Sequence, residues 1–94
     1  MPAYIIGTIR VTDPARWQLY LDRVGPTFMP HGGRVLFRAV KAQALNGDAH
    51  GERVVVAEFA DMAALRAWFD SPEYQALVAL RDAGADVVLT AYES

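Results

Sequence analysis

The chain contains no cysteine, and this absence removes several kinds of chemistry at once. Disulfides, thiolate metal sites and cysteine nucleophiles are all excluded. An excess of positive charge is also lacking, because 9 Lys and Arg residues face 11 Asp and Glu residues and the formal net charge is −2. Nucleic acids and anionic membranes attract strongly basic surfaces, so neither is expected as a partner.

Long apolar runs are absent as well. No segment approaches the ~20 apolar residues of a membrane span, and the first residues lack the basic region and apolar run of a signal peptide. The absence of cysteine fits a reducing compartment, so we expect a cytoplasmic location. A chain of 94 residues has room for one core, and we expect a single domain over residues 1–94.

What the chain has in abundance is apolar residues, which make up 53% of the sequence. A domain of this size cannot hide so much apolar surface alone, so self-association is expected.

Four segments rich in β-branched and aromatic residues are predicted to be strands, over residues 3–11, 34–45, 53–59 and 85–92. Helix-capping residues precede the apolar helical patterns, namely Asp13 before Pro14, Asp61, and Ser71 before Pro72. Gly25-Pro26 is predicted to weaken the first helix, and the residues around Ser71-Pro72 to split the second.

The resulting order is β-α-β-β-α-β, which predicts an α+β, ferredoxin-like fold with a four-stranded antiparallel sheet and helices on one face. Right-handed connections place the first and third strands in the centre. The strands are apolar on both sides, as the run Val54, Val55, Val56 illustrates. A second copy of the sheet is the simplest cover for the face without helices.

Several ordered motifs at characteristic spacing then identify a resemblance: Val11-Thr12-Asp13-Pro14, Tyr20, Pro26-Thr27, Gly32-Gly33-Arg34, Arg38, Glu58-Phe59 and residues 69–77. In these motifs the chain resembles the bacterial domain-of-unknown-function family thirteen-thirty, within the dimeric α/β-barrel superfamily. The resemblance implies a homodimer whose two sheets face each other and enclose a barrel-like cavity. It implies no established activity, because the superfamily includes cofactor-free monooxygenases, lactone isomerases, haem-degrading enzymes and ligand-sensing domains.

Arg38 and Glu58 are the first candidate pair, because they lie on adjacent strands of a predicted hairpin and face each other in a suitable register. In one interpretation Arg38 holds a substrate oxyanion while Glu58 orients it or acts as a base. In the other, the two form a salt bridge that fixes register or dimer pairing. Arg34 lies four residues before Arg38, so a regular strand puts both guanidinium groups on one face.

Other polar residues complete the predicted site. His31 precedes Gly32-Gly33 and is suited to proton transfer, although a solvated loop histidine is the simpler interpretation. Tyr20 could direct its hydroxyl into a cavity or belong to the core. Thr8 and Thr90 interrupt apolar strands, and they could line a pocket or bond across the ladder.

We therefore hypothesise a small-molecule-binding homodimer. One form of this hypothesis is a cofactor-independent enzyme that acts on a small carbonyl or carboxylate compound. The candidate catalytic residues are Arg38, Glu58 and His31, and the candidate ligand-binding residues are Tyr20, Arg34, Thr8 and Thr90. The alternative is a non-catalytic structural or ligand-sensing dimer module. A haem-processing enzyme is a third hypothesis and would need His31 aimed into the cavity. No cofactor or metal is expected, because the chain has no phosphate-binding glycine loop and no metal-ligand spacing.

Overall fold

The structure is a computed structural model that describes residues 1–94. Its elements follow one another in the order β1 (Ala3–Val11), α1 (Pro14–Phe28), a 3₁₀-helix (Met29–His31), β2 (Arg34–Val40), β3 (Arg53–Phe59), α2 (Met62–Phe69), α3 (Pro72–Gln75), α4 (Val78–Gly84) and β4 (Ala85–Glu93). This order confirms the ferredoxin-like β-α-β-β-α-β plan, with the second helical segment divided into three short helices. No helix has the length and apolar character needed to cross a membrane.

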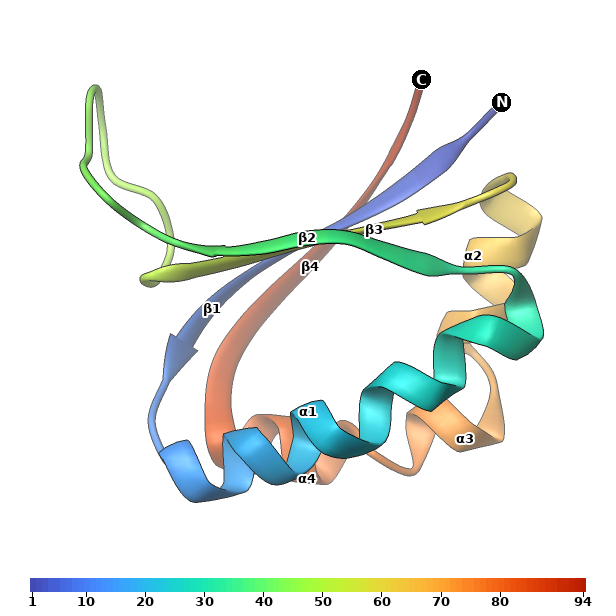
Figure 1. The fold of residues 1–94 in the computed structure, drawn as a ribbon, viewed down its shortest axis with the longest axis horizontal. Coiled ribbons are helices and arrows are strands. Elements are labelled where there is room, and N and C mark those ends of the chain that lie inside the picture. Colours follow the sequence, from blue (N-terminus) through green and yellow to red (C-terminus); the bar gives the residue numbers. More distant parts are fainter.

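The four strands form one antiparallel sheet in the order β2-β3-β1-β4, so the first and third strands are central as predicted. Figure 1 shows the helices gathered on one side of this sheet, which we call the inner face. Nothing in the chain covers the opposite side, which we call the outer face. The loop between β2 and β3 projects on the outer side (Figure 1).

The predicted helix caps are confirmed, because each is a local bond between a side chain and the backbone. Asp13 accepts a hydrogen bond from the backbone N–H of Arg16 at 3.2 Å, and Asp61 accepts one from Ala64 at 2.8 Å. Ser71 accepts a bond from the N–H of Tyr74 at 3.2 Å, with Pro72 in the first helical position. These caps fix where α1, α2 and α3 begin.

Two boundaries differ from the sequence-based prediction. The helix α1 continues through Pro26 to Phe28, because Thr27 and Phe28 are both anchored in the core. The ring of Phe28 stacks on Trp68 with centroids 4.8 Å apart. The strand β2 ends at Val40 rather than at residue 45, and the chain returns at Glu52, whose backbone N–H bonds to the carbonyl of Ile9 at 3.0 Å.

The core lies between the inner face and the helices and is strongly aromatic. Trp68, Tyr74 and Phe59 are its largest fully buried side chains. The indole N–H of Trp68 donates to the Thr27 hydroxyl at 2.9 Å, and that hydroxyl donates to the carbonyl of Val24 at 2.6 Å. These bonds satisfy the buried polar atoms and fix α1 against α2.

The chain turns at Gly32 and Gly33 before it enters β2, and glycine is needed at these two positions for different reasons. Gly32 has a φ of +70°, the left-handed conformation in which glycine is favoured. At Gly33 a Cβ atom would lie 2.5 Å from the Phe59 ring, so only glycine lets the chain pass this closely over the core. The close approach is confined to Gly33, since a Cβ atom on Gly32 would meet nothing within 4 Å.

Candidate functional site

A β-bulge in β2 decides which way its arginines point. Arg34 pairs with Glu58 and Val35 with Ala57, but the next pairs are Phe37 with Val56 and Arg38 with Val55. Leu36 is therefore the extra residue, and it reverses the alternation of side chains beyond it. Residues that oppose each other in a ladder share a face, so Arg34 lies on the outer face and Arg38 on the inner face.

The expected pairing of Arg38 with Glu58 is therefore wrong. Glu58 pairs instead with Arg34, whose Nη2 and Nε atoms lie 2.9 and 3.1 Å from one carboxylate oxygen of Glu58. The expectation failed because it assumed a register in which Arg38 opposes Glu58, and because it assumed an unbroken alternation, in which Arg34 and Arg38 share a face. The bulge at Leu36 separates them onto opposite sides of the sheet.

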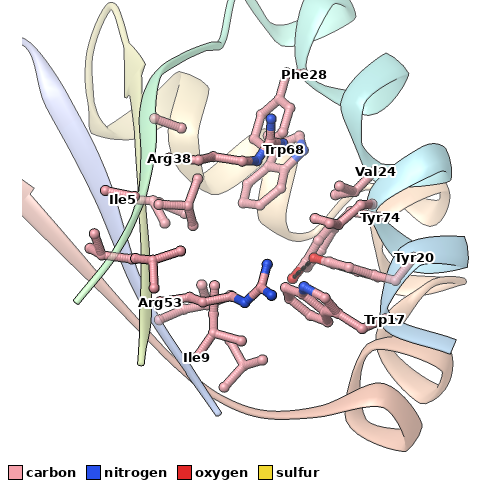
Figure 2. A pocket seen from close by; sticks show the side chains of 18 residues that line it. Ile5, Ile9, Trp17, Tyr20, Val24, Phe28, Arg38, Arg53, Trp68 and Tyr74 are labelled. Carbon is pink, nitrogen blue, oxygen red and sulfur yellow. Dashed lines mark hydrogen bonds between the residues drawn. The ribbon is translucent and has the colours of Figure 1, made fainter. Parts of the chain in front are cut away.

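Beneath the inner face lies a cavity of about 180 Å³, bounded by the sheet on one side and by the helices on the other. Its wall contains 16 hydrophobic residues of 18, and Ile5, Val24 and Ala57 are buried members of this apolar lining. Figure 2 shows the side chains of Arg38 and Arg53 entering the cavity from the strands, opposite Tyr20 and Tyr74. Both arginines are exposed at one edge, so the cavity opens beside β2.

Two tyrosine hydroxyls form the polar part of the opposite wall. The hydroxyl groups of Tyr20 and Tyr74 lie 3.3 Å apart, and Arg81 donates a hydrogen bond from Nη1 to the Tyr74 oxygen at 2.9 Å. Arg81 is held in turn by Asp82, with Nε 3.0 Å from the carboxylate. Burial, reinforced by Tyr74, raises the pKa of Tyr20 well above its ordinary value, so its hydroxyl stays protonated at neutral pH.

The sequence-predicted residues divide between the two faces. Arg38 and Tyr20 line the cavity. The other face carries Arg34, Glu58, Thr8 and Thr90, as the strand pairings place them. Thr8 opposes Val88, and Thr90 opposes Ile6.

His31 ends the 3₁₀-helix and does not line the cavity. The haem hypothesis needs a histidine aimed into the cavity, and no histidine lines the inner-face cavity. No group of three or more His, Asp or Glu side chains is placed to hold a metal ion.

Sequence reasoning missed Arg53 and did not include Tyr74 among the candidate site residues. A signal for Arg53 was present, because counting back in steps of two from the core residue Phe59 reaches Ala57, Val55 and Arg53 on one face. This cavity lies within one chain, under the helices, and is a different space from the barrel-like cavity that the resemblance implies between the sheets of two copies.

Comparison with known proteins identifies the family of this chain. A family model for a domain of unknown function, DUF1330, matches residues 2–94. The chain belongs to the DUF1330 family. This confirms the resemblance identified in the sequence motifs. A search of functionally curated proteins finds no match.

Solved structures support the fold of this DUF1330 member. A protein of unknown function from Rhodopseudomonas palustris, RPA0582, is 25% identical with a TM-score of 0.82, and the match covers 99% of this chain and 82% of that one. The cofactor-independent oxygenase SnoaB from Streptomyces nogalater is 15% identical with a TM-score of 0.73, covering 99% and 92%. A dimeric ferredoxin-like protein of unknown function from Thermobifida fusca is 19% identical with a TM-score of 0.70, covering 100% and 92%.

Proposed function

We propose that this protein binds a small, largely apolar molecule bearing a carbonyl or carboxylate group in the inner-face cavity. The cavity is the observation that carries this proposal. An apolar cavity of about 150 Å³ is large enough for benzene, so a space of about 180 Å³ suits a one- or two-ring compound. The opening beside β2 gives such a molecule a route into the cavity.

The polar groups of the cavity wall supply hydrogen-bond donors, which is why the ligand should carry an acceptor oxygen. Arg38 and Arg53 are guanidinium donors with no acceptor capacity. The Tyr20 hydroxyl donates its proton to the Tyr74 oxygen, which leaves the Tyr74 O–H as a further donor. A carbonyl or carboxylate oxygen matches these donors, whereas an amine does not.

We propose further that the protein is a homodimer that pairs through the outer face of its sheet. The outer face presents Phe37, Val88 and Tyr92 with 52%, 46% and 52% of their surface exposed. A second copy would remove this apolar surface from water. Support also comes from the neighbour from Thermobifida fusca, which is described as dimeric and shares the fold.

In its catalytic form the proposed function is cofactor-independent chemistry on the bound carbonyl compound. The guanidinium groups of Arg38 and Arg53 would stabilise negative charge on the carbonyl oxygen when hydroxide from the solvent removes the proton of an adjacent C–H and becomes water. SnoaB shows that this fold accommodates cofactor-independent oxygenation.

A second candidate, ligand sensing without catalysis, is favoured by the composition of the wall. No histidine or carboxylate lines the cavity, so the protein itself supplies no general base near neutral pH.

Binding is tested with acetophenone, a one-ring ketone, by two-dimensional NMR of the ¹⁵N-labelled protein. The chain has only 2 tryptophans, Trp17 and Trp68, and both line the cavity, so their indole N–H signals report on its contents. We expect acetophenone to shift both signals. Ala57→Leu should weaken binding because it fills the buried floor, and Ala63→Leu on the exposed surface of α2 is the matched control. Unshifted indole signals, or equal binding by the Ala57 variant, would contradict the proposal.

The catalytic and sensing candidates are separated by proton exchange on the same compound. Acetophenone in D₂O replaces its α-hydrogens with deuterium through an enolate, and the loss of the methyl signal gives the rate. A rate above that of buffer, lost in Arg38→Met, identifies enolate stabilisation and supports the enzyme. Exchange at the buffer rate while acetophenone is bound supports the sensor.

Native mass spectrometry of the purified protein reports the subunit count and any co-purified molecule.

A further inference from the structure

Arg38 and Arg53 form a pair of cations on one wall of the cavity. Arg38 opposes Val55 across the β2–β3 ladder, and Arg53 opposes Val40 two residues further along. The two arginines are therefore diagonal neighbours on the same face, and diagonal positions lie about 7–8 Å apart, within reach of long side chains. Figure 2 shows both side chains directed from the strands into the cavity.

Neither arginine of this pair forms an ion pair with a carboxylate. Five other arginines form ion pairs, namely Arg10, Arg16, Arg34, Arg66 and Arg81. Arg38 and Arg53 form none, and no Asp or Glu lines the cavity. The nearby carboxylate of Glu52 attracts Arg53, but it accepts the backbone N–H of Val11 at 3.1 Å, forms no ion pair with Arg53 and does not line the cavity.

Two cations within reach of each other on one face of a sheet repel, and an anion bound between them would offset that repulsion. The bulge at Leu36 is what brings Arg38 to this position, because an unbroken strand would have sent it to the outer face. The chain therefore departs from regular strand geometry and, in doing so, places a second cation beside Arg53 over an apolar cavity.

We propose that Arg38 and Arg53 together bind the carboxylate of a one- or two-ring monocarboxylic acid whose ring occupies the apolar interior. This inference rests on the proposed function and narrows it from an acceptor-bearing ligand to an anion. Guanidinium groups match the planar, two-oxygen geometry of a carboxylate. The adjoining apolar wall excludes water on one side and strengthens the attraction.

The test compares two probes of nearly the same shape, phenylacetate and its neutral amide, phenylacetamide. Both are titrated into the ¹⁵N-labelled protein at low ionic strength, with the indole signals of Trp17 and Trp68 as the readout. We expect phenylacetate to bind at least about tenfold more tightly than the amide. Because exposed charges are screened by salt, this preference should shrink when ionic strength rises to about 1 M, where the screening length is about 3 Å.

Variants assign the preference to residues. The double variant Arg38→Met, Arg53→Met should bind both probes equally, and each single variant should lose part of the preference. Arg23→Met removes an exposed arginine on α1 outside the cavity and should keep the full preference. If circular dichroism shows that the double variant is unfolded, the two single variants provide the test.

The outcomes separate this inference from the function on which it rests. Equal binding of acid and amide by the unaltered protein overturns the anion site and leaves cavity binding standing. A preference that survives in the double variant, or that disappears equally in Arg23→Met, overturns the assignment to Arg38 and Arg53. Failure of acetophenone, phenylacetate and phenylacetamide alike to shift either indole signal overturns both proposals.

Discussion

Replacing Gly33 by alanine tests how tightly the entry to β2 is packed against the core. The added Cβ atom would lie 2.5, 2.7 and 3.1 Å from three carbons of the Phe59 ring. Phe59 is 1% exposed, and its ring lies between Phe28 and Trp68, with centroids 6.1 and 5.6 Å away. The ring has no free space to move into, so the methyl group overpacks the core at a cost of about 1–3 kcal/mol.

Thermal unfolding followed by circular dichroism measures this effect. For a domain of this size 1 kcal/mol corresponds to about 4–8 °C, so the melting temperature of Gly33→Ala should fall by at least about 4 °C. All proteins are compared at one concentration, because the stability of a dimer depends on it.

A double-mutant cycle identifies the cause of the Gly33→Ala loss. Phe59→Leu removes ring atoms that the new methyl group meets, so Gly33→Ala should cost less in that background, with a coupling of about 0.5–3 kcal/mol. A Gly33→Ala protein as stable as the original, or an equal cost in both backgrounds, would show that the Phe59 ring does not oppose the added methyl group.

Three further predictions follow from single contacts. The folded state holds the Tyr20 proton more tightly than the unfolded chain, so the free energy of unfolding should be unaffected by Tyr20 below pH 10 and fall above pH 10 by about 1.4 kcal/mol per pH unit. Denaturant titrations at several pH values should show a flatter slope for Tyr20→Phe, and an unchanged slope would contradict this role of Tyr20. Thr27→Val leaves the buried Trp68 N–H without its acceptor and should cost about 1–3 kcal/mol in urea unfolding, whereas no loss would show the bond to be dispensable. Phe37→Glu should raise the dissociation constant of the proposed dimer at least tenfold in analytical ultracentrifugation, which corresponds to about 1.4 kcal/mol. Leu19→Glu on α1 should leave the constant unchanged, and equal effects of the two variants would argue against pairing through the outer face.

The sequence was sufficient for features that depend on local bonding or on the pattern of apolar residues. Asp13, Asp61 and Ser71 cap helices through bonds to residues three positions ahead, so neighbouring residues alone determine them. The order of elements and the central position of β1 and β3 followed from connection rules that hold for most folds. The continuation of α1 through Pro26 was missed because Phe28 is fixed by Trp68, a residue 40 positions away in sequence.

The candidate site depended on geometry that no local pattern carries. A regular strand places residues 34 and 38 on one face, and only the pairing with β3 reveals the bulge at Leu36 that separates them. The same pairing joins Glu58 to Arg34 rather than to Arg38. A bulge leaves no required residue type in the sequence, so Arg38 could be chosen as a candidate residue but not placed on its face.

The bulge also gives the two faces of the sheet separate tasks in the proposed function. Beyond Leu36, Phe37 points to the outer face, where we propose that a second copy packs, and Arg38 points into the cavity. Because the sheet itself lies between the cavity and the outer face, ligand selection should not need the partner. Phe37→Glu at a concentration where it is monomeric should therefore keep the preference of the unaltered protein for phenylacetate over phenylacetamide. Loss of that preference in a folded monomer would mean that dimer pairing holds β2 in its bulged register, and the two faces would then be coupled through a single residue.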